Sequence, residues 1–224
     1  MTGMSTLTRQ NLLQYVTAKA AMPALATPGS VWLALFTAVG TDAGTGFTEI
    51  ATGSYARVLT QAANINAAGS TIPCTISNSG TLSFPASTAS WGNVIAWGIY
   101  DAVTAGNLLY WDFLGNDPWF PCTITLASPG VITAIGITAG SAPTLANGAI
   151  VTFESTYGGT LPVAIVQYAQ QTVAGLSADT FNVAVNTAST GSGMVRQLTV
   201  QTVPSGVTVS FTGGAPGNLV LTAA

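Results

Sequence analysis

The chain has 224 residues and combines 48% hydrophobic residues with only 5% charged residues and a formal net charge of −3. An ordinary soluble domain carries about a quarter charged residues, so this chain either stays soluble through Thr, Ser, Asn and Gln or covers much of its surface with partners. The four basic residues are scattered and histidine is absent. These features argue against nucleic-acid binding, the usual zinc and transition-metal sites, a bound cofactor, and histidine-based nucleophilic catalysis.

Neither a membrane span nor an export signal is expected. The longest apolar run, Val31 to Phe36, is far shorter than the roughly 20 residues of a spanning helix. The N-terminus imitates a signal peptide with an Ala-Leu-Ala site at 24–26, but Gln14 and Lys19 interrupt its apolar region. We therefore expect an uncleaved intracellular product.

The first predicted element is an amphipathic helix over residues 7 to 21. Its apolar residues keep helical spacing until Pro23 ends the pattern, and they are Leu12, Leu13, Val16 and Ala20. Such a helix most often packs over one face of a sheet, and docking on a partner is the alternative.

A strand, VWLALFTA at 31–38, follows and leads to a loop rich in Gly, Thr and Asp at 40–46. The next strand begins within GSYARVLTQ at 53–61. Arg57 in this segment is expected to be a solvated or loop-tethering charge and not a ligand contact. Residues 62–90 continue as short strands rich in Ser, Thr and Asn.

The stretch from Trp91 to Trp111 is predicted to be the β-hairpin at the middle of the core. Apolar and aromatic residues alternate along its first half, DAVTAGN turns the chain, and LLYWDFL continues it. Aromatic side chains bury the most area per residue, and three of the five tryptophans lie here. The core positions expected from the whole sequence are Trp32, Leu35, Phe84, Trp91, Trp97, Tyr100, Trp111, Phe153 and Phe181.

Four segments, in this order, resemble a domain found in many tailed-bacteriophage virion proteins of the tail fibre, minor tail and head-decoration types. They are the L-x-L-F-T strand at Leu33 to Thr37, the G-x-Y-A-R motif at Gly53 to Arg57, the segment from Ser77 to Pro85 that ends in F-P, and the hairpin from Trp91 to Tyr110. The resemblance covers about half of the chain. It implies a structural role in the virion and carries over no catalytic residue.

The second half contains short strands at regular spacing with turn signals between them, as expected of a small all-β module. The run from Ala146 to Ala184 resembles a module appended to phage tail-fibre-like proteins, with N-G-x-x-V-x-F, G-T-L-P and D-T-F-x-V in order. Asn147-Gly148 supplies a turn. Apolar residues of two strands are expected to pack together, namely Val151 and Phe153 with Phe181, Val183 and Val185.

The C-terminal segment VPSGVTVSFTGGAPGNLVLTA resembles an ending that, in shorter relatives of the phage domain, follows the hairpin almost at once. Here it comes about 90 residues later, which predicts an insertion at a loop. Residues 1–121 and 198–224 would form a discontinuous antiparallel β-sandwich assembly domain with one N-terminal helix. Residues 122–197 would form an inserted, smaller all-β domain, so that the whole fold is mainly β. A tandem arrangement is the alternative.

The insertion makes a specific pairing prediction. Val207 to Phe211 and Leu219 to Leu221 should return to the sheet that contains the hairpin. The two cysteines, Cys74 and Cys122, are far apart in sequence, so a disulfide and two buried free thiols both remain open.

Catalysis is not expected. Asp101, Asp112 and Asp117 cluster around the hairpin, and glycosidases use carboxyl pairs about 5 to 9 Å apart. However, Asp101 lies at the hairpin turn and Asp117 in an Asn-Asp-Pro turn, where aspartate binds its own backbone. Glu154 and Asp179 of the second half have no plausible acid–base partner.

Two functions remain. The first is a virion structural protein, made in the bacterial host cytoplasm, that assembles as a homo-oligomer with other virion proteins as a neck collar, tail component or capsid decoration. The second is a fibre-type module that binds host-surface glycans through aromatics such as Trp119, Phe120 and Tyr157. The low charge favours the first, because interfaces deplete charge at their cores.

Overall fold

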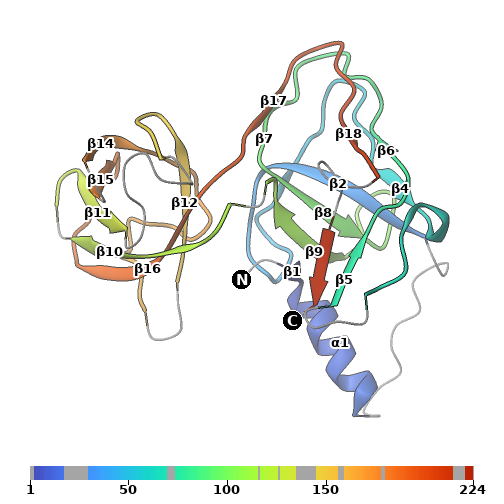
Figure 1. Cartoon of the computed structure of the whole chain (residues 1–224), viewed down its shortest axis with the longest axis horizontal. Helices are drawn as coiled ribbons and strands as arrows, with labels where there is room; N and C mark the ends of the chain where they lie inside the picture. Colours follow the sequence, from blue (N-terminus) through green and yellow to red (C-terminus); the bar gives the residue numbers. More distant parts are fainter. Residues whose placement is uncertain are drawn as a thin grey trace. The chain divides into compact units, whose positions relative to one another are not determined.

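A computed structural model of the chain describes residues 3–17, 30–69, 74–115, 117–125, 127–134, 145–155, 159–177, 180–213 and 220–223. The described part is mainly β, with antiparallel sheets, one α-helix near the N-terminus and a short 3₁₀ helix, η1, at Ala62–Asn64 (Figure 1). The predicted class, mainly β with one N-terminal helix, is confirmed.

The chain divides into two compact units. The first, called here the split unit, comprises Thr2–Phe113 together with Gln201–Ala224. The second, called here the module, comprises Leu114–Val200. Each unit has its own sheets and its own buried residues, and they are described separately.

The centre of the split unit is a six-stranded antiparallel sheet. Strand β8 (Ala96–Tyr100) lies between β9 (Leu108–Phe113) and β2 (Val31–Ala38). At one edge β1 (Gly3–Met4) pairs with β9, and at the other β3 (Thr48–Glu49) and β4 (Val58–Thr60) both pair with β2. The predicted strand at 31–38 and the predicted hairpin, here β8 and β9, are confirmed.

Three two-stranded ladders join the C-terminal segment to the first part of the chain. They pair β17 (Gln201–Val203) with β7 (Gly92–Val94), β18 (Ser210–Phe211) with β6 (Leu82–Ser83), and β19 (Val220–Ala223) with β5 (Cys74–Ser77).

The prediction that this C-terminal segment pairs within the hairpin's own sheet is therefore wrong for the described residues. The segment returns to the split unit, but to separate ladders. β18 and β19 pair with β6 and β5, two strands that precede the hairpin and lie outside its sheet. The hairpin itself divides at Ile95 into β7 and β8. The Ile95 N–H bonds the Phe36 carbonyl at 2.9 Å, while β7 pairs with β17 instead of β2. Residue 219 lies outside the described residues.

The middle strands of the six-stranded sheet are buried on both faces. All five residues of β8 and the four residues at 33–36 of β2 are buried, as in strands covered on each side. Among the core positions expected in this unit, the buried ones are Leu35, Phe84, Trp91, Trp97, Tyr100 and Trp111. Trp32 differs, because it lies near the end of β2 and is only half-buried.

The module is a seven-stranded antiparallel sheet in the order β13–β12–β16–β10–β11–β15–β14. The bounds are β10 Phe120–Thr125, β11 Gly130–Ala134, β12 Ile150–Glu154, β13 Gln171–Thr172, β14 Ala174–Ser177, β15 Thr180–Val183 and β16 Gly191–Gln197. Its apolar core includes the predicted partners Val151, Phe153, Phe181 and Val183, with Val185 packed against it.

Helix α1 spans Thr6–Val16, and the end of the predicted helix, residues 18–21, lies outside the described residues. Its first turn is fixed to β9. Ser5 Oγ accepts a hydrogen bond from the Thr8 N–H at 3.2 Å, as an N-cap serine does. The Ser5 N–H and the Thr8 hydroxyl both donate to the Leu109 carbonyl, at 2.9 and 2.8 Å.

The expectation that the apolar residues of α1 pack over a sheet face is wrong for Leu12 and Leu13, whereas Leu7 lines a pocket with Leu108 of β9. Leu7, Leu12 and Leu13 are 37%, 39% and 63% exposed. The helix is tied down at its first turn, and its leucines reach solvent.

Candidate functional site

The four segments that carry the phage-domain resemblance meet in one network of the split unit. Tyr55 accepts a hydrogen bond from the Leu35 N–H and donates one to Glu49 Oε1, both at 2.9 Å. Its ring stacks on Phe84 at a centroid distance of 5.8 Å and meets Trp91 edge-on at 5.5 Å. One tyrosine thus joins β2, the F-P segment and the start of the hairpin.

The network requires glycine at the first position of the G-x-Y-A-R motif. Gly53 has a φ of +65°, and a Cβ there would lie 2.6 Å from the Ala89 carbonyl oxygen and 2.9 Å from Trp91 Nε1. The Gly53 carbonyl accepts the hydrogen bond of Trp91 Nε1 at 3.0 Å. The motif therefore fixes the indole that begins the hairpin.

Arg57 is the charged centre of the network. Its Nε and Nη2 donate to the two carboxylate oxygens of Glu49 at 2.8 and 2.6 Å, a bidentate pair. Its Nη1 donates to the carbonyls of Ala102 and Ala105 at 2.8 and 2.7 Å. Its guanidinium carbon lies 3.6 Å from the ring centroid of Tyr100. Because its side chain is only 7% exposed, Arg57 is a loop-tethering charge and not a solvated one.

Burial and charge set the protonation states in this network. Burial raises the pKa of Tyr55 well above its ordinary value, and the Glu49 charge raises it further. Burial also raises the pKa of Tyr100, although the Arg57 charge acts in the opposite direction. Burial lowers the pKa of Arg57, but its hydrogen bonds to Glu49 and that residue's charge outweigh burial and raise it. Near pH 7 the two phenols are neutral and the guanidinium is charged, so these groups are not poised for proton transfer.

The turn between β8 and β9 is held in one shape. The Asp101 carboxylate accepts hydrogen bonds from the Asn107 N–H at 2.6 Å and from Asn107 Nδ2 at 2.8 Å. Ala105 and Gly106 have φ values of +51° and +76°, a conformation that is unfavourable for alanine. The prediction that Asp101 binds the backbone of its own turn is confirmed, and Arg57 holds the same turn from the other side.

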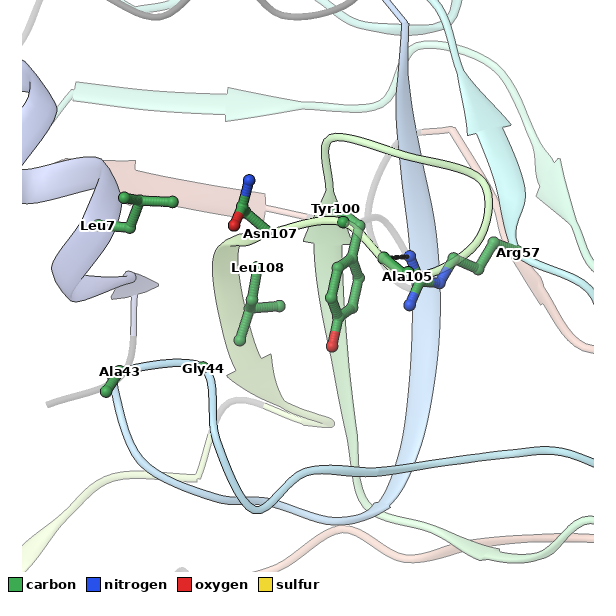
Figure 2. A pocket seen from close by; sticks show the side chains of 9 residues that line it. Leu7, Ala43, Gly44, Arg57, Tyr100, Ala105, Asn107 and Leu108 are labelled. Atoms are coloured by element: carbon green, nitrogen blue, oxygen red, sulfur yellow. Dashed lines mark hydrogen bonds between the residues drawn. The ribbon is translucent and has the colours of Figure 1, made fainter.

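A pocket of about 280 Å³ lies beside this turn. It is lined by Leu7, Ala43, Gly44, Arg57, Tyr100, Ala105, Gly106, Asn107 and Leu108. Figure 2 shows Tyr100 and Leu108 between Leu7 of α1 and Arg57. Arg57 and Asn107 already bond to the turn itself, and ligand pockets usually measure about 300 to 1,000 Å³. The pocket is thus close to the lower end of that range, and those two polar side chains already serve the turn.

Asp42 connects the loop at 40–46 with α1 and β9. Its Oδ2 forms an ion pair with Arg9 Nη2 at 2.9 Å, and its Oδ1 accepts a hydrogen bond from Trp111 Nε1 at 3.2 Å. Its carbonyl accepts the Thr6 N–H at 2.7 Å. This loop therefore clamps the start of the helix onto the sheet.

The carboxylates considered for catalysis are bound in separate surroundings. Asp112 Oδ1 accepts the Phe113 N–H at 2.7 Å, and Asp117 Oδ2 accepts the Thr199 hydroxyl at 3.0 Å. Asp101 and Asp112 belong to the split unit, whereas Asp117 belongs to the module. Within the described ranges, no three Asp, Glu or Cys side chains gather in a way that could hold a metal ion.

Two further groups named from the sequence lie in the module. Glu154 Oε2 accepts a hydrogen bond from the Tyr168 hydroxyl at 3.1 Å, and Asp179 lies outside the described residues. Cys122 is a free, buried thiol, so it forms no disulfide with Cys74. Burial raises the pKa of the Cys122 thiol to about 12, which makes it unreactive.

The aromatic residues considered for glycan binding are partly enclosed. Trp119 and Phe120 are both half-buried, and Phe120 packs against the module core. The guanidinium carbon of Arg196 lies 6.0 Å from the Trp119 ring centroid. Tyr157 lies outside the described residues.

Sequence reasoning singled out Arg57 but missed its partners. Asp42 falls in the predicted loop at 40–46 and Glu49 in no predicted element, yet each binds an arginine of the split unit. A usable signal exists, because a charge that is partly buried requires a partner. In a chain with only four basic residues, the acidic residues nearest in sequence to an arginine are the first candidates for its partner.

Comparison with known families identifies part of the chain. Residues 3–117, a little over half of its length, match the family described as Podophage GP4 fiber I protein gp80. This stretch contains the four segments and the whole Arg57 network. No curated protein matches the chain. In the part that the structure describes, no helix is long and apolar enough to cross a membrane.

Proposed function

Because this chain belongs to the family of the podophage GP4 fiber I protein gp80, we propose that it is a fibre-type structural component of a tailed-phage virion. It assembles with copies of itself and with other virion proteins, at the neck, along the tail or on the capsid. It is made in the bacterial host cytoplasm and remains in the particle. It acts by burying contact area between rigid surfaces, without a chemical step.

The observation that supports this role is the use of the resembling segments for packing. Tyr55, Arg57 and Trp91 bind the chain's own backbone and side chains. A catalytic site needs groups that are poised for proton transfer or free to bind a substrate. This network instead fixes the shape of loops, and surfaces fixed in advance lose less entropy when they associate.

We also propose that the split unit is the assembly domain and that the module is inserted into it, with boundaries at residues 114 and 200 in place of the expected 122 and 197. The two residues at which the split unit connects to the module lie close together, because both pair within residues 94–96. Phe113 pairs with Ala96 and Gln201 pairs with Val94. Because insertion is tolerated where chain ends lie close together, this geometry supports an insertion over a tandem arrangement.

The test of the virion role uses purified particles. Quantitative mass spectrometry of gradient-purified virions should find this protein at a fixed copy number, and immunogold labelling should place it at one position on the particle. A non-structural phage protein serves as the control for carry-over. Absence of the chain from particles in which the major capsid protein is complete would overturn the proposal.

Binding of host glycans by the module stays a prediction. The full-length protein, added to host cells before infection, should then reduce phage adsorption. Adsorption that is unchanged at saturating protein would remove this role for the module and leave the assembly role intact.

A further inference from the structure

We propose that helix α1 is a self-association element and that its partner is α1 of a second copy of this chain. The inference deepens the proposed fibre role and rests on the homo-oligomer that this role includes. It is carried by a helix that is firmly anchored at one end and presents uncharged, partly apolar side chains at the other.

Among the described residues, the contacts that anchor α1 lie in its first turn. Ser5 and Thr8 bond to the Leu109 carbonyl of β9, and Arg9 bonds to Asp42. Figure 1 shows α1 starting beside β1 and running away from the sheet. The orientation of the helix is therefore fixed at its first turn, while its second half extends away from the sheet.

The second half is exposed over several residues. Gln10, Leu12, Leu13 and Gln14 are all exposed, and Leu13 is the most exposed of the leucines at 63%. Isolated helices shorter than about 12 to 15 residues are marginal in water, so helices of this length depend on packing. In the part of the chain that the structure describes, Gln10, Leu12, Leu13 and Gln14 are left exposed, so a partner helix can pack against them.

The charge pattern favours a second copy as the partner. In a symmetric self-interface the same patch meets itself, so exposed lysines or glutamates would repel. Helix α1 contains one charged residue, Arg9, and Asp42 neutralises it. The amides of Gln10 and Gln14 each contain donors and an acceptor, so an identical amide can bind them. The exposed half of α1 is thus chemically complementary to itself.

The size of the helix sets the strength of the association. A pair of helices of 11 residues each buries less than the roughly 1,600 Å² of a standard interface. We therefore expect a reversible oligomer that depends on protein concentration in solution and becomes stable where copies are held side by side on the particle.

The experiment uses two full-length variants of opposite charge, Leu13→Glu and Leu13→Lys, in sedimentation velocity over a range of concentrations. Each variant alone should dissociate, with a rise of about a hundredfold or more in Kd, because like charges then face each other. An equimolar mixture should recover association, because glutamate then faces lysine. Circular dichroism spectra that match wild type establish that both variants are folded.

Val163→Glu is the matched control, because Val163 of the module is 98% exposed and receives the same change. It should associate like wild type. A wild-type protein that is monomeric at all concentrations, or Leu13 variants that associate like wild type, would overturn the inference. Dissociated variants that fail to recover on mixing would overturn the pairing of α1 with itself. Failure of the virion role would instead appear as absence of the protein from particles.

Discussion

The split unit and the module are both antiparallel β structures with a buried apolar core, but the split unit adds a hydrogen-bonded arginine network to its core. In the split unit, Arg57 and Tyr55 tie loops from distant parts of the chain to the central sheet. In the module, a compact apolar core around Phe153 and Phe181 lies on one seven-stranded sheet. An apolar core supplies stability with little directional preference, whereas a hydrogen-bonded ion pair specifies geometry. The split unit is thus built to hold its loops in fixed shapes.

The largest effect is expected from Phe153→Ala, which tests whether the module depends on its core. Phe153 is fully buried, and truncating a buried phenylalanine to alanine costs about 4 kcal/mol. Hydrogen exchange measured by mass spectrometry should show faster exchange in the module strands, with β2, β8 and β9 unchanged. Equal acceleration in both units would contradict the distinction, because the two would then unfold together.

A somewhat smaller effect, confined to the split unit, is expected from Arg57→Met. Removing one partner of a buried ion pair costs about 3 kcal/mol, and here Glu49 and two turn carbonyls lose their donor. Urea unfolding combined with hydrogen exchange should show the loss in the split unit only. Arg57→Lys should recover part of it, since lysine keeps the charge but cannot make the bidentate contact. Wild-type stability of Arg57→Met would show that the network does not hold the unit.

Tyr55→Phe isolates a single hydroxyl of the same network. It leaves the ring against Phe84 but removes the acceptor of the Leu35 N–H and one of the donors to Glu49. The expected loss is about 1 to 2 kcal/mol in the split unit, measured by urea unfolding. Tyr100→Phe, which keeps its ring against Arg57, is the matched control. The hydroxyl would have no structural role if both variants were as stable as wild type.

The smallest of these differences is expected in the pH at which each unit begins to lose stability under alkaline conditions. A group whose pKa is raised by folding keeps its proton more tightly in the folded state, so stability is full below the unfolded pKa and falls as pH rises above it. For Cys122, whose pKa is raised from its ordinary value of 9.0 to about 12, stability falls over the pH range between these two values. For Tyr55 and Tyr100, whose pKa values are also raised, this range begins only above 10.0.

The module should therefore begin to weaken at a lower pH than the split unit. Urea midpoints of the two units, measured from about pH 8 to about pH 11, check this order. Cys122→Ala should remove the early decline of the module. A split unit that weakens first would reverse the assignment of these groups.

Local patterns in the sequence predict those features that depend on neighbouring residues. The run VWLALFTA forms β2 as predicted, because its apolar and β-branched residues suit a buried strand. Asp101 closes the hairpin turn as predicted, because its carboxylate reaches its own backbone. The class, mainly β with one N-terminal helix, follows from the same periodicities.

Long-range geometry decides the rest. The division of the hairpin strand at Ile95, and the ladders that β17, β18 and β19 form, depend on which strands compete for the same edge. The exposure of Leu13 depends on where α1 is anchored, and a periodic pattern carries no information about that position.

The sequence by itself determined a charge-poor, mainly β chain, because composition and periodicity are properties of the chain alone. Its four ordered segments added the resemblance to phage virion domains. Only the tertiary structure decided that Arg57 joins Glu49 to the carbonyls of Ala102 and Ala105. Those carbonyls lie more than 40 residues away along the chain. Such a contact exists only once the sheet has brought the two loops together, so local sequence cannot encode it.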